Sequence, residues 1–401
     1  AGTGGLLKTG GGTSVLSGGS LTMNAINANF RVDGATDVLN IAMPITWNTD
    51  SRIMKSGAGT LILSSGTIPL SDTSHRNVFY LNDGTLEIGG SAILNYGAGV
   101  PALFVGNGAL FRYNSTSDST IPSVILGLGA VSVTGSGTLT LKGATTYTGG
   151  TTVSAGTLQI GAGATGSVTG NITNNSIVTF NRTGSLTHAG VISGTGSVTT
   201  VGTGTITLTG SNTYSGGTTV SAGTLYTGAA SLTTPVFGTG TVTVNSGATL
   251  SLDRSTLSNS LSLNGGTLFT TNGFGEVWSG PIALNANSTV NVSYSTTFSN
   301  VVSGSANLTK IGSGALTLSG TNTYTGTTTV SAGSLVMDSA GALGNSTLLA
   351  IASGATVNLN GRTVSVNALQ LNGVTQAAGT YTSANTATYF TGSGSLLVGF
   401  A

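Results

Sequence analysis

The chain has 401 residues, of which 65 are Gly, none is Cys and only 5% are charged, and its formal net charge is +1. With 38% hydrophobic residues, it has neither the composition of a disordered chain nor the basic charge of a nucleic-acid binder. Zero Cys excludes a disulfide framework, and plentiful Thr, Val, Ser, Asn and Gly beside few helix formers predict strands and turns. The longest apolar run, Ile121–Val133, is too short and too interrupted to predict a transmembrane segment.

The first part of the chain, residues 1–133, is the less regular one. Lys8-Thr9-Gly10 and Lys55-Ser56-Gly57 share a Lys-x-Gly opening, and the alternation in Thr60-Leu61-Ile62-Leu63 predicts a strand. Most of the charged residues fall in this part, and the stretch Thr67–Asn77 predicts a projecting loop that carries Asp72, His75 and Arg76. We expect residues 1–133 to form a less regular N-terminal part of the repeat architecture, with longer loops. A separate N-terminal β domain is the alternative.

The second part, residues 134–401, contains one 24-residue phrase three times, G-x-G-[TA]-[LI]-T-L-x-G-x-x-T-Y-[TS]-G-x-T-T-V-S-A-G-[TS]-L. The copies are Gly135–Leu158, Gly202–Leu225 and Gly312–Leu335, which start 67 and 110 residues apart. Such repeats bury their apolar faces by stacking on one another, and both spacings are multiples of about 22 residues. The sequence therefore predicts an all-β fold, a right-handed parallel β-helix (β-solenoid) with about 22 residues per rung.

Each copy of the phrase contains three short stretches that alternate in polarity, such as residues 138–141, 151–154 and 157–160. We interpret them as the three strands of one rung, whose inward residues stack on the next rung. Tyr147, Tyr214 and Tyr324 occupy one repeat position, where packing at a corner is favoured over a track that stacks sugars. The predicted scaffold residues are Leu139, Leu141, Tyr147, Val153, Leu158, Ile206, Leu208, Tyr214, Val220, Leu225, Leu316, Leu318, Tyr324, Val330 and Leu335.

The sequence offers little that could carry catalysis. Polysaccharide lyases need clustered carboxylates and a basic residue, and the closest acidic pairs are Asp33/Asp37 and Asp83/Glu87. We expect the first pair to be solvated surface residues and Asp83, in Asn82-Asp83-Gly84, to cap a turn. His75 and His188 are the only histidines, too few for a metal site without Cys, and both are expected at the surface. The sequence thus predicts no enzyme, no catalytic residue, no metal and no cofactor.

The third copy carries a resemblance to a known family. The run from Lys310-Ile311-Gly312-Ser313-Gly314-Ala315-Leu316 to Gly333-Ser334-Leu335 resembles the passenger-associated transport repeat of bacterial autotransporters. The stretch 366–382, followed by Gly392-Ser393-Gly394-Ser395-Leu396, resembles the ending of such repeat regions in other secreted bacterial proteins. The resemblance implies a secreted β-helical passenger, extracellular or on the cell surface of a bacterium, without catalytic residues. In that family an outer-membrane translocator accompanies the passenger, and we expect none within these 401 residues.

The ends of a solenoid expose strand edges unless a cap covers them. Repeat-like sequence begins at Leu6-Leu7-Lys8 and continues to Ser395-Leu396, so no cap is predicted. We therefore expect a structural protein whose partner is itself, a head-to-tail homopolymer that forms a fibre or surface layer. The alternative is a passenger acting as an adhesin for a cell-surface glycan, with its binding patch in the loops of residues 67–80 and 270–280. An enzyme acting on polysaccharide is a third hypothesis; metal-dependent lyase activity would reveal it.

Overall fold

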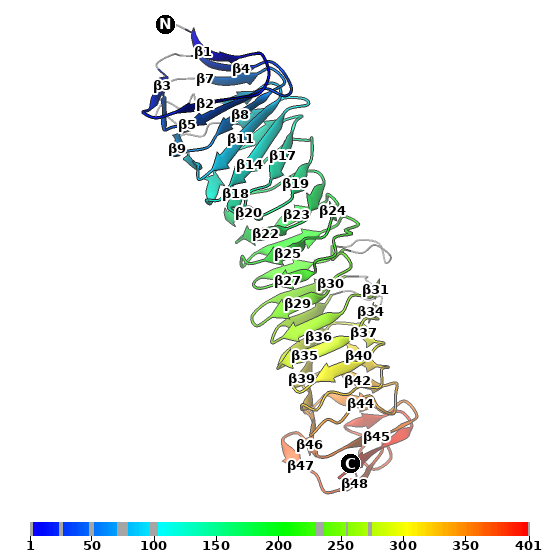
Figure 1. Ribbon diagram of the computed structural model, residues 1–401. Helices are drawn as coiled ribbons and strands as arrows, with labels where there is room; N and C mark the ends of the chain where they lie inside the picture. The colour runs from blue at the N-terminus through cyan, green and yellow to red at the C-terminus, as the bar shows by residue number, and fades with distance from the viewer. Residues whose placement is uncertain are drawn as a thin grey trace. The chain divides into compact units, whose positions relative to one another are not determined.

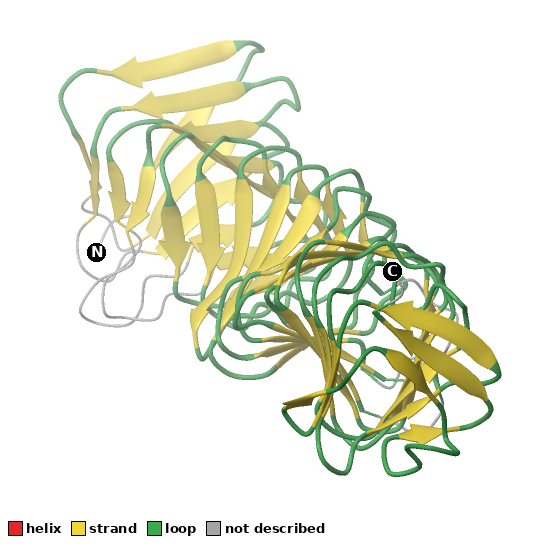
Figure 2. Ribbon diagram, turned by 90° about the horizontal axis from the view of Figure 1, so that it is seen from below, coloured by secondary structure: helices red, strands yellow, loops and turns green. Residues whose placement is uncertain are grey.

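The computed structural model describes residues 3–23, 27–47, 52–69, 79–95, 103–228, 236–253, 256–271 and 275–399. It divides into two compact units, residues 1–204 and 205–401, so the boundary predicted at residue 133 falls inside the first unit. The described residues form strands joined by turns, without a helix (Figure 2). Accordingly, none of them belongs to a helix long and apolar enough to cross a membrane.

Unit 1 stacks its strands in parallel on successive coils (Figure 1). The first sheet contains β1 (Thr3–Lys8), β4 (Asn27–Val32), β7 (Arg52–Ser56), β10 (Phe79–Leu81), β13 (Leu103–Val105) and β16 (Ile125–Gly127). The second contains β2 (Thr13–Ser17), β5 (Val38–Ala42), β8 (Thr60–Leu63), β11 (Thr85–Gly90), β14 (Leu110–Ser115), β17 (Ala130–Val133), β19 (Thr151–Val153), β21 (Ile172–Asn174) and β24 (Ile192–Ser193).

The remaining strands of unit 1 form shorter sheets. Two pairs are β3 (Leu21–Met23) with β6 (Ile45–Trp47), and β9 (Thr67–Pro69) with β12 (Ile93–Asn95). A longer row contains β15 (Ser119–Ile121), β18 (Thr138–Leu141), β20 (Thr157–Gly163), β22 (Ile177–Arg182) and β25 (Ser197–Thr200). The one strand of unit 1 not yet named is β23 (Leu186–His188).

Unit 2 repeats this arrangement. One row contains β27 (Thr218–Val220), β29 (Val242–Asn245), β32 (Leu261–Asn264), β35 (Ile282–Ala286) and β38 (Val302–Gly304). A second contains β26 (Thr205–Leu208), β28 (Thr224–Tyr226), β30 (Thr249–Leu252), β33 (Thr267–Thr270), β36 (Ser288–Val292), β39 (Leu308–Ile311), β41 (Thr328–Val330), β43 (Leu349–Ile351), β46 (Leu369–Leu371) and β47 (Val374–Thr375). The third contains β31 (Thr256–Leu257), β34 (Glu276–Trp278), β37 (Ser295–Phe298), β40 (Ala315–Leu318), β42 (Ser334–Met337), β44 (Thr356–Asn358) and β49 (Phe390–Thr391).

The fold is therefore the predicted all-β parallel solenoid, with about 21 residues per turn against the 22 expected. The interpretation of one phrase as one rung was wrong, however. Leu139 of β18 pairs directly with Leu158 of β20, and Leu316 of β40 pairs with Leu335 of β42. The first and third strands of a phrase thus stack on consecutive coils, because the step of 19 residues from one leucine to the other makes one complete turn.

Alternation along each strand sends one set of side chains into the core. Every predicted scaffold residue lies there, at 2% exposure or less. The repeated tyrosines lie at corners, where the hydroxyls of Tyr147, Tyr214 and Tyr324 each share a hydrogen bond with the threonine four residues later, at 2.7, 2.6 and 2.7 Å. Since all three rings are 0% exposed, the structure excludes them from a sugar-stacking track.

Buried cations occupy several other corners. Lys55 and Lys310 are both 0% exposed. The Lys310 ammonium donates to the carbonyls of Ile311, Gly312 and, one coil further on, Ala332, at 3.0, 2.7 and 3.0 Å. Lys55 makes the equivalent bonds to Ser56, Gly57 and Asp83, at 3.2, 2.5 and 2.9 Å. The lysine of the Lys-x-Gly opening thus links one coil to the next by hydrogen bonds.

The end of unit 2 departs from the parallel pattern and corrects the prediction that no cap is present. Strand β47 turns back and pairs antiparallel with β46. Strand β48 (Gly379–Tyr381) pairs antiparallel with β50 (Gly394–Val398), which lies beside β45 (Arg362–Val366). These antiparallel strands cover parallel edges that would otherwise remain open to another chain.

Candidate functional site: a polar groove on unit 1

The acidic pairs singled out in the sequence have structural partners. Asp33 lies beside Arg31 at 2.5 Å, but Asp37 is only 2% exposed and accepts a hydrogen bond from the Gly34 amide at 3.1 Å. The solvated-surface prediction was therefore wrong for Asp37, which closes the turn before β5. Asp83 caps its turn as predicted, because its carboxylate accepts from the Gly84 amide at 2.7 Å.

Glu87 does not form a carboxylate pair with Asp83. It projects from β11 and accepts from Arg112 at 3.0 Å and from Asn114 at 2.9 Å. Both partners lie on the neighbouring strand β14, so this cluster ties two coils together. Among the described residues, no group of three His, Asp or Glu side chains is placed to hold a metal ion.

The surface prediction for His188 was also wrong. The side chain is 3% exposed and its Nδ1 lies 3.2 Å from the Val168 carbonyl. Its ring packs against Phe180, with the two centroids 6.0 Å apart, and its buried Nε2 has no hydrogen-bond partner among the described residues. Burial lowers the pKa of His188, although the Val168 carbonyl opposes this shift. Asp72, His75 and Arg76 lie outside the described residues.

The two loops predicted to carry a binding patch lie only partly within the described residues. Residues 70–78 and 272–274 lie outside them, and residues 276–278 form strand β34 instead of a loop. Trp278 is 1% exposed, and its indole donates to the Asn259 carbonyl at 2.8 Å. This part of the predicted patch belongs to the core.

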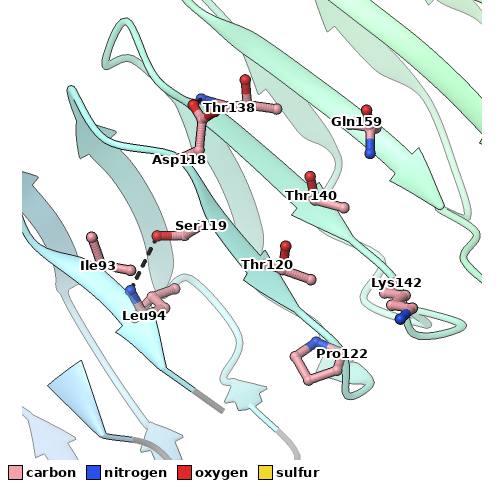
Figure 3. A pocket seen from close by; sticks show the side chains of 10 residues that line it. All are labelled: Ile93, Leu94, Asp118, Ser119, Thr120, Pro122, Thr138, Thr140, Lys142 and Gln159. Carbon is pink, nitrogen blue, oxygen red and sulfur yellow. Dashed lines mark hydrogen bonds between the residues drawn. The ribbon is translucent and has the colours of Figure 1, made fainter. Parts of the chain in front are cut away.

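A groove of about 670 Å³ lies elsewhere, on the solvent side of β12, β15, β18 and β20 (Figure 3). Among the described residues, the rows of strands are interrupted here, because β12 pairs with β9 while β15 begins a new row with β18. The Leu94 amide of β12 donates to the Ser119 hydroxyl of β15 at 3.1 Å. The groove follows from this interruption.

The floor of the groove is made of outward-facing polar side chains. Thr140 on β18 lies opposite Thr120 on β15 and Gln159 on β20. Asp118 and Lys142 lie at opposite ends of this array (Figure 3). Asp118 also accepts from the Thr138 amide at 2.7 Å, which fixes its position.

Apolar side chains form part of the groove wall. Ile93, which is 41% exposed, and Pro122 line the groove beside the hydroxyl groups. This combination can bind an uncharged polar chain by hydrogen bonds and by contact with its C–H groups. Among the described residues that line it, the carboxylate of Asp118 and the ammonium of Lys142 lie at opposite ends.

Sequence reasoning missed this groove. The threonines of β18 belong to the repeated phrase, in which they look like any other outward positions. The signal that was available is the change from longer, less regular coils to regular coils near residue 133. Neighbouring coils of different length cannot continue every ladder, and a hollow results where one ladder stops.

Stacked parallel coils of this kind define a β-solenoid repeat protein. Residues 132–160, 198–226 and 308–337 match the model of the passenger-associated-transport-repeat family, and these matches contain the three copies of the phrase. No curated protein and no solved structure matches the chain. The repeats and the solenoid together fit a passenger of the autotransporter type.

Proposed function

We propose that the chain is a non-enzymatic adhesin of the passenger type, which binds a carbohydrate chain in the groove of unit 1. The passenger repeats support a location outside the bacterial cell or on its surface. The observation that carries the proposal is the row of Thr120, Thr140 and Gln159, whose polar side chains line one hollow of about 670 Å³. Sugar hydroxyls both donate and accept hydrogen bonds, as these side chains do.

The test is binding of the purified chain to an array of bacterial and host glycans. The variant Thr120→Val/Thr140→Val removes two hydroxyls while keeping the shape and β-propensity of the side chains. We expect it to bind its best glycan at least tenfold more weakly, because each lost hydrogen bond is worth about 1 kcal/mol. The control Thr289→Val changes an outward threonine of unit 2 and should bind normally. Equal binding by all three proteins would contradict the proposal.

Self-association is the second candidate function, and one observation favours it. The first coil leaves Leu7 66% exposed and Val15 54% exposed, on strands that each have a single neighbour. A head-to-tail polymer also needs an open edge at the other end, where β47 and β48 cover the stack. For this reason we place it second. Long filaments in negative-stain electron microscopy across a dilution series would reverse this order.

A further inference from the structure

The outward face of the first sheet of unit 1 carries an apolar column. Met54, Tyr80, Phe104 and Leu126 lie directly opposite one another on the neighbouring strands β7, β10, β13 and β16. All four side chains are half-buried. The residues before them, Ile53, Phe79, Leu103 and Ile125, are core residues at 4% exposure or less. Because side chains alternate across a strand, the column belongs to the solvent side, and we call it the apolar ladder.

Two aromatic rings form the centre of the apolar ladder. The centroids of Tyr80 and Phe104 are 6.1 Å apart, and the ring planes are tilted by 48°. Rings in this arrangement do not cover each other's faces as a parallel stack would. They therefore leave aromatic surface for a ligand, in a chain with only 6% aromatic residues.

The column continues into a small hollow. Asn29 lies opposite Met54, and Gly5 lies opposite Asn29. A space of about 190 Å³ lies here, lined by Gly5, Leu6, Leu7, Asn29 and Arg31. The ladder thus leads from ring surfaces to amide and guanidinium donors.

The size of the apolar ladder decides what it can bind. Four strands span three strand separations, about 14 Å, and the column is one side chain wide. A stable protein–protein interface needs about 800 Å² from each partner, far more than this column offers. Two or three sugar rings fit the length, and their C–H faces can pack on Tyr80 and Phe104. Their hydroxyls can bond to Asn29, opposite Met54, and to Ser56 beside it.

We propose that the apolar ladder and its hollow form a second carbohydrate site, which binds a short segment of a β-linked oligosaccharide by ring contact. Its ligand class is that of the proposed function, but it contains no residue of the groove. Either proposal can therefore be contradicted while the other stands. The ladder supplies the contact with sugar rings that the groove, lined by no aromatic residue, does not.

The experiment titrates the full chain with cellohexaose and with chitohexaose by calorimetry. The variant Tyr80→Thr/Phe104→Thr introduces the residue that this chain uses at many outward strand positions. We expect at least tenfold weaker binding of the hexasaccharide that binds the unaltered chain. The control Tyr294→Thr replaces a tyrosine of unit 2 that is 57% exposed, and Thr120→Val/Thr140→Val alters only the groove; both should keep ladder binding.

The outcomes separate the possible occupants. Failure of both hexasaccharides to bind the unaltered chain at millimolar concentration would overturn the second site, as would equal affinity in the ladder variant. If the unaltered chain forms a concentration-dependent dimer that only the ladder variant loses, a second copy of the chain covers the apolar ladder. That result would also overturn the second carbohydrate site. If the double variant unfolds, the single variant Met54→Thr is titrated in its place. Saturation-transfer NMR on the unaltered chain then tests whether sugar C–H groups contact aromatic protons.

Discussion

At the scale of single residues, the buried cations show how this chain uses its few charges. Lys310 lies in a core position of β39, where burial lowers its pKa from 10.5 to about 8. Burial lowers the pKa of Lys55 to about 8 as well, although Asp83 partly opposes the shift. Each ammonium offsets the cost of its burial by donating three hydrogen bonds to carbonyls, two within its own coil and one to the next.

We expect Lys310→Met to lower the free energy of unfolding by about 1–3 kcal/mol, because three carbonyls lose their donor. Urea unfolding followed by circular dichroism measures this change. Lys142→Met is the matched control, since Lys142 is exposed at the edge of the groove, and its midpoint should not move. An unchanged midpoint for Lys310→Met would show that the cradle contributes nothing to stability.

The two buried lysines make the free energy of unfolding depend on pH with a defined sign. Between pH 8 and 10.5 the unfolded chain retains protons on Lys55 and Lys310 that the folded chain has lost. Stability should therefore rise with pH in this window. Above about pH 10, burial of Tyr147, Tyr214 and Tyr324 acts in the opposite direction, because it raises the pKa of each. Unfolding midpoints at pH 7.5–9.5 should rise less steeply in Lys310→Met than in the unaltered chain.

His188 gives the complementary prediction at acid pH. Burial holds its pKa below the ordinary 6.5, so the unfolded chain takes up a proton there before the folded chain does. Stability should fall as the pH drops from 7 to 5. His188→Gln, which can still donate to the Val168 carbonyl, should show a smaller loss over this range. A loss of the same size in both proteins would assign the acid sensitivity to other groups.

At the scale of elements, the corner tyrosines close the long turn of each phrase. Tyr324→Phe should cost about 1 kcal/mol, because the Thr328 hydroxyl loses a buried partner at 2.7 Å. Tyr324→Ala should cost about 3–5 kcal/mol, because it also empties a core position. Tyr294→Phe, at an exposed site, is the control for the lost hydroxyl. Chemical denaturation measures all three, and equal effects at the two sites would contradict the corner role.

The same phrases show where sequence reasoning about elements reached its limit. Alternation identified the strands of residues 138–141, 151–153 and 157–160 and the leucines and valines that enter the core. It could not tell whether two strands lie on one rung or on consecutive rungs, because both arrangements bury the same side chains. The register is set by how many residues the corners use, and only the pairing of Leu139 with Leu158 shows it.

The cap follows from a signal that the sequence contains, the pair Asn372-Gly373. Both residues have positive φ, 49° and 79°, which is the geometry of a tight hairpin turn favoured by Asn-Gly. The chain therefore reverses at this point and places β47 antiparallel to β46, where a corner would have continued the coil.

At the scale of the whole molecule, the cap should keep the end of unit 2 from associating. Removal of residues 361–401 takes away β45 to β50 and leaves β43 and β44 without their later neighbours. We expect the shortened chain to form oligomers or aggregates in light scattering at concentrations where the full chain is monodisperse. If the shortened chain and the full chain have the same size distribution, these strands do not act as a cap.

The sequence by itself determined the solenoid, its approximate mean coil length and the apolar residues that the repeated phrase places in the core, because repeats of this kind can bury their apolar faces only by stacking. It also determined the family resemblance, which rests on the same phrase. The tertiary structure alone decided which outward side chains meet. Thr120, Thr140 and Gln159 come from three strands, and Tyr80 and Phe104 from two, so their proximity depends on register between coils. No local pattern encodes that register, because coil length varies with each corner.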